Sequence, residues 1–260
     1  MEAIFPFKAL PRFHESDRTE YFKIASVAVR SASQFYKTRL VTDKFSAEIF
    51  KEEGIKFDEV EIRSDIEQYK GGNFAVPKIL TMMSRTLPYI MLDFDTIITQ
   101  RIPEIDTITF GFKEVDISKS IHTKDLEYVY ERYFQPYHKY LYRFQPSITS
   151  IDWKIIPNMG LFYCSFPQKV VETYQTIIDQ YSFDKLEYAS ACVFEQLLLY
   201  NFLLNSNFVP SFLQEHNGLY KSSSKIYFYH FDSVERKKKK HSSFIDKMEN
   251  KLSNERTCLI

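Results

Sequence analysis

The stretch from Tyr89 to Ile98 reads Tyr-Ile-Met-Leu-Asp-Phe-Asp-Thr-Ile-Ile and carries the strongest signal in the chain. Its apolar first half predicts a buried strand, 89–92, that ends at Asp93 and Asp95. Parallel α/β sheets bind ligands beyond the carboxyl ends of their strands. Two carboxylates this close repel each other, and a divalent cation removes the repulsion. Carboxylate oxygens suit Mg²⁺ or Mn²⁺, so we expect this pair to hold such an ion. The alternative is that Asp93 only caps a turn while Asp95 faces water.

Upstream of this stretch, short apolar runs alternate with amphipathic ones. The runs predict strands at 3–7, 38–42 and 57–62, and helices at 18–36, 45–53 and 73–85. Asn73 is the expected N-cap of the last helix, and Gly54 ends the helix before it. Strands separated by helices predict an α/β fold with a mainly parallel, doubly wound central sheet flanked by helices.

Downstream of residue 98 the alternation is weaker. The expected strands are 107–112, 161–164, 208–213 and 226–230, and the expected helices are 124–142, 168–181 and 189–204. The residues Pro157-Asn158-Met159-Gly160 predict a turn before the strand 161–164. The polar tail from Lys237 onward is expected to hold one amphipathic helix. Because no repeat or linker divides the chain, we expect a single domain.

Composition excludes some classes of function. The 260 residues include 34 Lys and Arg against 34 Asp and Glu, so the formal net charge is zero and general affinity for nucleic acid is not expected. The three cysteines show no metal-finger spacing, which favours a reducing compartment. The sequence shows no signal-peptide pattern and no apolar run of the ~18–20 residues that a bilayer span needs. We therefore expect a cytoplasmic protein.

The order of elements over residues 21–98 resembles the donor-binding half of the GT-A glycosyltransferases. The resemblance rests on the strand that ends in Val41-Thr42-Asp43 and on the strand that ends in Asp93 and Asp95. It is closest to the small glycogenin-like, retaining transferases. It implies one GT-A-like (Rossmann-like) domain over 1–236, with a nucleotide-sugar-binding half at 1–100 and an acceptor-side half at 101–236. Residues 237–260 would then form a basic polar tail.

The same resemblance implies a metal-dependent transfer of sugar from a nucleotide-diphosphate donor to an acceptor hydroxyl. A UDP-sugar is the favoured donor, and the acceptor would be a glycan, a lipid-linked molecule or a protein. The cation would be Mn²⁺ or Mg²⁺, held by Asp93, Asp95 and a late histidine, His230. Lys78 and either Arg236 or Lys237 would hold the diphosphate. This chain departs from the family pattern in lacking the usual glycine between His230 and that basic segment.

Further residues receive roles from the resemblance. Asp43 lies where such folds contact the nucleoside, and Asn158 with Gly160 matches the Asn-x-Gly loop that lines the sugar or acceptor pocket. Glu195 and Gln196 match an acidic-or-amide residue followed by Gln beneath the reacting sugar. If the reaction inverts the anomeric centre, Glu195 would deprotonate the acceptor. If it retains the configuration, Glu195 or Gln196 would position the sugar or stabilise the developing cation.

Other functions stay open at this point. A haloacid dehalogenase-type phosphatase also carries Asp-x-Asp after a strand, but the later acidic pair that it needs is not evident. Asp179 and Asp184 have a suitable spacing, but Asp179 falls within a helical pattern. A second alternative is a module that binds a nucleotide sugar or glycan without turnover. The basic tail, with Phe244 and Ile245, would permit weak peripheral contact with the inner face of a membrane.

Overall fold

The computed structural model describes residues 1–9, 15–71, 73–116, 155–181, 192–214, 227–230 and 239–257. The first half contains β1 (Glu2–Pro6), α1 (Glu15–Ala32), β2 (Lys37–Thr42), α2 (Lys44–Glu52), β3 (Glu59–Ile62), α3 (Ser64–Gln68), α4 (Ala75–Met83), β4 (Tyr89–Leu92), β5 (Thr96–Ile98) and β6 (Ile108–Asp116). The second half contains β7 (Ile155–Cys164), α7 (Pro167–Tyr181), a π-helix (Cys192–Leu198), α9 (Leu199–Asn205), β8 (Ser211–Phe212), β9 (Phe228–His230) and α10 (Lys239–Thr257). The expected helix at 124–142 lies outside the described residues.

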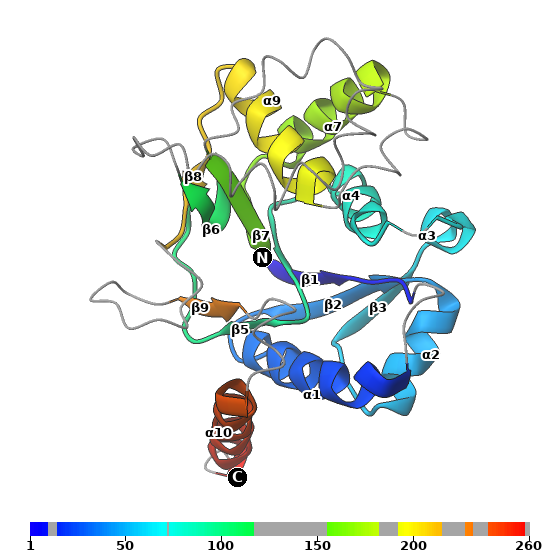
Figure 1. Ribbon diagram of the computed structural model, residues 1–260, viewed down its shortest axis with the longest axis vertical. Coiled ribbons are helices and arrows are strands. Elements are labelled where there is room, and N and C mark those ends of the chain that lie inside the picture. The colour runs from blue at the N-terminus through cyan, green and yellow to red at the C-terminus, as the bar shows by residue number, and fades with distance from the viewer. Residues whose placement is uncertain are drawn as a thin grey trace.

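The described strands form a seven-stranded sheet in the order β3-β2-β1-β4-β7-β6-β8. Strands β3, β2, β1 and β4 run parallel, β7 is antiparallel to both β4 and β6, and β8 is parallel to β6. Helices α1 and α2 lie on one side of this sheet, and α4, α7 and α9 lie on the other (Figure 1). The prediction of an α/β domain with a mainly parallel sheet is confirmed.

Alternating strand side chains supply the two apolar layers. On β1, Ile4 faces the core beneath α4, α7 and α9, whereas Ala3 and Phe5 face the core beneath α1 and α2. On β4, Met91 and Leu92 divide in the same way. Both faces of the central strands are therefore buried, as parallel sheets require. All four residues of β4 are buried, and Asp93 is the first residue after the strand.

The predicted turn at 157–160 is wrong. These residues lie inside β7, a ten-residue strand that pairs with both β4 and β6. The β6–β7 pairing shifts register between Phe110 and Phe112 and again between Lys113 and Val115, which indicates β-bulges in β6. Residues 156–164 are buried, and burial between two strands outweighs the local turn preference of Pro, Asn and Gly. Asn158 and Gly160 are consequently strand residues.

Strands β5 and β9 form a separate two-stranded antiparallel sheet, here called the β5–β9 ribbon. Helix α10 lies beside α1 and the ribbon (Figure 1) and makes a small core of its own there. Ile245 and Leu252 of α10 are buried against Ile24 and Val27 of α1. The amphipathic helix expected in the tail is confirmed, but its apolar side chains contact protein, so the expected membrane contact is not supported.

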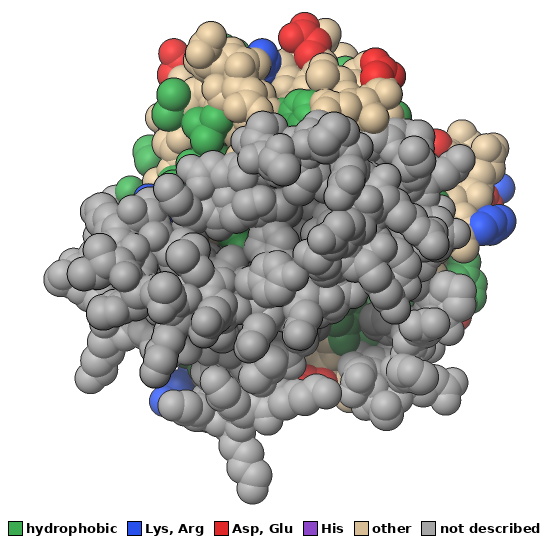
Figure 2. All heavy atoms as spheres, turned by 45° about the horizontal axis from the view of Figure 1, so that its top comes forward, with side chains coloured by type: hydrophobic (Ala, Val, Ile, Leu, Met, Phe, Trp, Pro, Cys, Tyr) green, Lys and Arg blue, Asp and Glu red, His purple; other side chains and the backbone are tan. Residues whose placement is uncertain are grey.

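In the view of Figure 2, the coloured part of the surface carries acidic and basic side chains interspersed with hydrophobic ones. Among the helices of the described residues, none has both the length and the apolar character that a membrane span requires.

Candidate functional site

A cluster of possible metal ligands lies beyond the carboxyl end of β4. Asp93 follows the strand directly, and the Thr96 amide donates to the Asp93 carbonyl at 3.0 Å, which turns the chain into β5. In the ribbon, Thr96 pairs with His230 of β9. One ligand atom from each of Asp93, Asp95 and His230 lies within 4.8 Å of the others, and His230 Nε2 is 3.4 Å from Asp95 Oδ1. The structure therefore brings together the three residues that the resemblance predicts.

This donor set fits a small divalent cation. Two carboxylates and one imidazole are ligands that Mn²⁺ accepts, and Mg²⁺ accepts the carboxylates. Bonds of about 2.1 Å place neighbouring ligands about 3 Å and opposite ligands about 4.2 Å apart, so the three side chains would move closer together around a bound ion. The Asp93 side chain is about one third exposed, whereas Asp95 and His230 are mostly buried, which leaves an open side for a substrate.

Gly160 of β7 supports this cluster through its backbone and through its lack of a side chain. Its carbonyl accepts from the Asp93 amide and from the Thr96 hydroxyl, both at 2.9 Å. A Cβ at Gly160 would lie 2.3 Å from His230 Cδ2 and 2.6 Å from Nε2, closer than any real contact. The imidazole therefore occupies the space that a side chain would fill. Asn158 Oδ1 accepts from the Gly160 amide at 2.8 Å and fixes this segment further.

Lys78 is a buried cation behind Asp93. It lies on α4, is 5% exposed, and donates to the Met159 carbonyl at 3.0 Å. Its Nζ is 2.6 Å from Asp93 Oδ1 and 3.3 Å from Glu195 Oε1. Burial lowers the pKa of Lys78, but the two carboxylates outweigh it and raise the pKa above its ordinary value. Lys78 thus stays charged and links the expected metal ligand to Glu195.

Glu195 and Gln196 lie in the π-helix, where an extra residue per turn re-aims side chains. Glu195 is 3% exposed, and among the described residues neither its Oε2 nor the buried Oε1 of Gln196 has a hydrogen-bond partner. Burial raises the pKa of Glu195 to about 7; Lys78 opposes this shift and Asp93 reinforces it. Buried oxygens without partners are rare in proteins. Two adjacent ones beside an acidic cluster point to a polar ligand.

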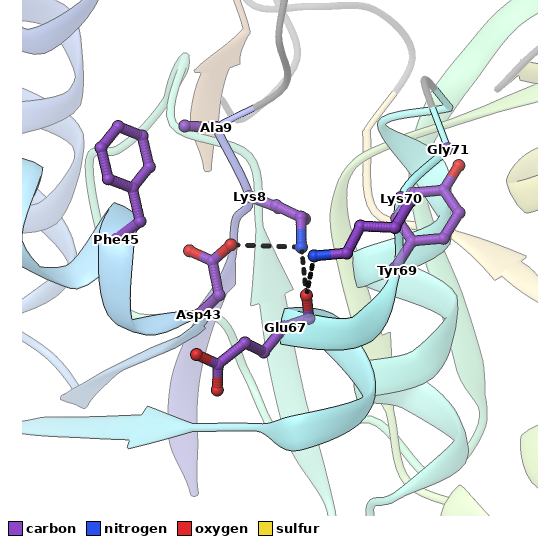
Figure 3. A pocket seen from close by; sticks show the side chains of 8 residues that line it. All are labelled: Lys8, Ala9, Asp43, Phe45, Glu67, Tyr69, Lys70 and Gly71. Carbon is purple, nitrogen blue, oxygen red and sulfur yellow. Dashed lines mark hydrogen bonds and ion pairs between the residues drawn. The ribbon is translucent and has the colours of Figure 1, made fainter.

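A cavity of about 430 Å³ opens beyond the carboxyl ends of β1 and β2, within the usual range for small-molecule sites. Figure 3 shows Phe45 on one side of it, Tyr69 on the other, and the Asp43, Lys8 and Glu67 side chains between them. Asp43 Oδ1 caps α2 by accepting from the Ser46 amide at 2.8 Å, and Asp43 Oδ2 is 3.2 Å from Lys8 Nζ. Adjacent strands lie about 4.8 Å apart, so β1 and β2, whose ends line this cavity, lie roughly 5 and 10 Å from the strand that precedes Asp93.

Sequence reasoning missed several residues of this region. Lys8, Phe45 and Tyr69 line the cavity, but each is ordinary in sequence and becomes conspicuous only when the strands are placed side by side. The side chain of Gln214 was missed too, although it bonds to the strand that carries His230. The one available signal was position, because Lys8 follows a predicted strand as Asp43 does. Arg236 and Lys237 lie outside the described residues.

The fold and the site define an α/β protein with a candidate divalent-cation centre at the carboxyl edge of its parallel strands. The chain belongs to DUF6734, a family of unknown function, whose model matches residues 16–258. No curated protein matches the chain.

Several solved structures are similar over most of the chain. Mouse xyloside xylosyltransferase 1 in its apo form has 9% identity and a TM-score of 0.47, covering 90% of this chain and 98% of its own. The inositol-1-phosphate CTP transferase of T. maritima has 11% identity and a TM-score of 0.47, covering 95% and 96%. The galactosyltransferase LgtC, in complex with donor and acceptor sugar analogs, has 9% identity and a TM-score of 0.41, covering 98% and 96%. Likenesses this distant do not identify a function, which has to come from the residues of the site.

Proposed function

We propose that this protein is a metal-dependent glycosyltransferase that moves a sugar from a nucleotide-diphosphate donor to an acceptor hydroxyl. The observation that carries the proposal is the convergence of Asp93, Asp95 and His230, whose ligand atoms lie within 4.8 Å of one another. His230 is 135 residues from Asp95 in sequence (230 minus 95), so local sequence does not explain their meeting. When bound, Mn²⁺ or Mg²⁺ would neutralise negative charge that develops on the departing nucleoside diphosphate.

The cavity between Phe45 and Tyr69 supports a nucleotide donor. Two aromatic side chains on facing walls suit a flat base, and Asp43, at the floor, offers a carboxylate to ribose or base. A base placed there leaves the diphosphate to extend toward Asp93. Arg236 and Lys237 follow His230 closely in sequence, and we propose that one of them contacts that diphosphate. UDP-sugars are the first donors to test.

Glu195 and Gln196 are the proposed residues at the reacting end. Buried oxygens of both residues lack partners within the described part of the chain, and we propose that they accept from sugar hydroxyls. A pKa of about 7 suits a general base in an inverting reaction, whereas deep burial against Lys78 suits a positioning role in a retaining one. The anomeric configuration of the product distinguishes the two. Asn158 and Gly160 are proposed to shape the sugar pocket from β7.

The phosphatase alternative has less support. One of its candidate acids, Asp179, lies on α7 and accepts from Gln175 at 2.7 Å in an exposed pair. The other, Asp184, lies outside the described residues. A binding module without turnover would keep the metal and nucleotide contacts, so only a product assay separates it from an enzyme.

A thermal-shift screen followed by a product assay tests the proposal. UDP-, GDP-, dTDP- and CMP-sugars are added with Mn²⁺ or with EDTA to the wild type and to Asp95→Ala. We expect one nucleotide family to raise the melting temperature only with Mn²⁺ and only in the wild type. Release of the nucleoside diphosphate from that donor, or of CMP from a CMP-sugar, then indicates transfer or hydrolysis. A shift without release favours the binding module, and hydrolysis of p-nitrophenyl phosphate without any donor shift favours the phosphatase.

A further inference from the structure

The strand that carries His230 is short and lies outside the main sheet. Strand β9 spans Phe228–His230, and in the described part of the chain it pairs only with β5. A two-stranded ribbon is marginally stable in water, so its position has to come from packing on other elements. Because strand side chains alternate, Phe228 and His230 share one face and Tyr229 points from the other. The two faces meet different parts of the molecule.

The inner face rests on two glycines of the main sheet. The His230 ring lies over Gly160, and a Cβ at Gly111 would lie 2.8 Å from Phe228 Cζ. The Gln214 amide acts as a short strand partner. Its Nε2 donates to the Phe228 carbonyl at 3.1 Å, and its Oε1 accepts from the Tyr227 amide at 3.0 Å. Phe228 is fully buried in the main core, and the Phe112 ring lies 6.2 Å from the Phe228 ring and 6.0 Å from the His230 ring, so the main sheet holds this face.

The outer face is covered by the C-terminal helix. Tyr229 stacks edge-on against Phe244 of α10, with ring centroids 4.6 Å apart. Ile97 of β5 is fully buried in the same small core, with Ile245 of α10. Helix α10 is in turn anchored on α1, where Lys23 pairs with Asp246 at 2.5 Å. The ribbon is therefore held between the glycines beneath it and a helix above it.

We propose that α10 is a positioning element for the cation site, and that Phe244 holds His230 in place by packing on Tyr229. The inference rests on the proposed function, because it takes Asp93, Asp95 and His230 as the ligands. The C-terminal segment then completes the site, although none of its side chains contacts the ion. Groups that orient a metal ligand typically affect metal affinity by 10–100-fold.

Mn²⁺ titration by electron paramagnetic resonance tests this on the full chain. We expect Phe244→Ala to weaken Mn²⁺ binding about tenfold, and Phe244→Leu, which keeps apolar contact with Tyr229, to restore it to within about twofold. Lys247→Ala, at an exposed position of the same helix, serves as the matched control and should bind as the wild type does. Circular dichroism melts confirm that each variant is folded at the temperature of the titration.

A double-mutant cycle separates positioning from general loosening. In a His230→Ala background the ligand is absent, so Phe244→Ala should cause no further loss of affinity. Wild-type affinity in Phe244→Ala, or the same loss with and without His230, would overturn the positioning role of α10 and leave the proposed function intact. Equal Mn²⁺ binding by the wild type and Asp95→Ala would instead remove the cation site, and the proposed function and this inference with it.

Discussion

The parallel half of the sheet and the β5–β9 ribbon contribute to the same site in different ways. Strands β1 to β4 come from neighbouring segments of the chain, and β1, β2 and β4 contribute side chains to the cores on both faces of the sheet. The ribbon joins Thr96 to His230 across more than half of the sequence and depends on a helix outside the sheet. The carboxylates thus follow a strand of the core directly, whereas the strand of His230 is held by the main sheet on one face and by α10 on the other. Substitutions away from the ligands in the parallel half should therefore change stability, whereas substitutions that move the ribbon should change metal affinity.

The largest expected effect comes from the ligand that the core places. We expect Asp95→Ala to lower donor turnover about 1000-fold, because charge neutralisation by a metal is worth several kcal/mol and each 1.4 kcal/mol is tenfold. Steady-state assays with Mn²⁺ in excess measure this. Asp58→Ala, which removes a carboxylate bonded to the Thr38 amide at 2.7 Å and not part of the cluster, should keep turnover within a few-fold.

A second prediction concerns the pH dependence of stability in the metal-free protein. The pKa of Glu195 rises from an ordinary value of 4.5 to about 7 in the folded protein. A carboxyl group with a raised folded-state pKa stabilises the fold fully below pH 4.5, and this contribution is lost as the pH rises through 7. We expect Glu195→Gln to remove about 3 kcal/mol of the stability change between these two pH values.

Urea unfolding at several pH values measures that difference. Glu48→Gln, at an exposed position on α2, is the control and should leave the wild-type profile unchanged. If the stability of Glu195→Gln changed with pH as that of the wild type does, the pKa of Glu195 would not be raised in the folded protein. That result would contradict the effect of burial on this carboxyl group.

Two glycines offer a direct contrast between the regions. Gly160→Ala places a Cβ against the His230 ring, so we expect Mn²⁺ affinity to fall 10–100-fold while the main sheet stays folded. Gly54 has open space around it but a φ of 69°, so Gly54→Ala should cost about 1–2 kcal/mol of stability and leave Mn²⁺ affinity unchanged. Calorimetric Mn²⁺ titration measures the affinity of both variants, and urea unfolding measures their stability. The reverse pattern would contradict the assigned role of Gly160.

The smallest predicted effect lies in the parallel half. Arg85 makes a two-point contact with Glu61 of β3, with distances of 3.0 and 2.5 Å. Arg85→Ala should lower the free energy of unfolding by about 1 kcal/mol, the upper end for partly exposed ion pairs, and should not change metal affinity. A change in Mn²⁺ binding would show that the two regions are more tightly coupled than their contacts indicate.

The same contrast explains what the sequence predicted. Local patterns sufficed for β4 and the carboxylates beyond it, and for the end of α2 at Gly54, because strand burial and a positive φ leave local signatures. The turn expected at Pro157–Gly160 failed because pairing on both sides of β7 overrides local preference. Resemblance singled out His230, but nothing local indicates that Gln214 or Phe244 supports it. Those contacts join distant segments and become visible only in the fold.

The central claim is that one divalent cation joins Asp93, Asp95 and His230 to the diphosphate of a donor. Pulsed electron paramagnetic resonance of bound Mn²⁺ tests it most directly, because a coordinated nitrogen and the phosphorus of a phosphate coordinated through oxygen give distinct hyperfine couplings. We predict a nitrogen coupling that disappears in His230→Ala, and a phosphorus coupling that appears when the preferred nucleoside diphosphate is added. Bound Mn²⁺ without a nitrogen coupling, or without phosphorus coupling at saturating nucleotide, would contradict the claim.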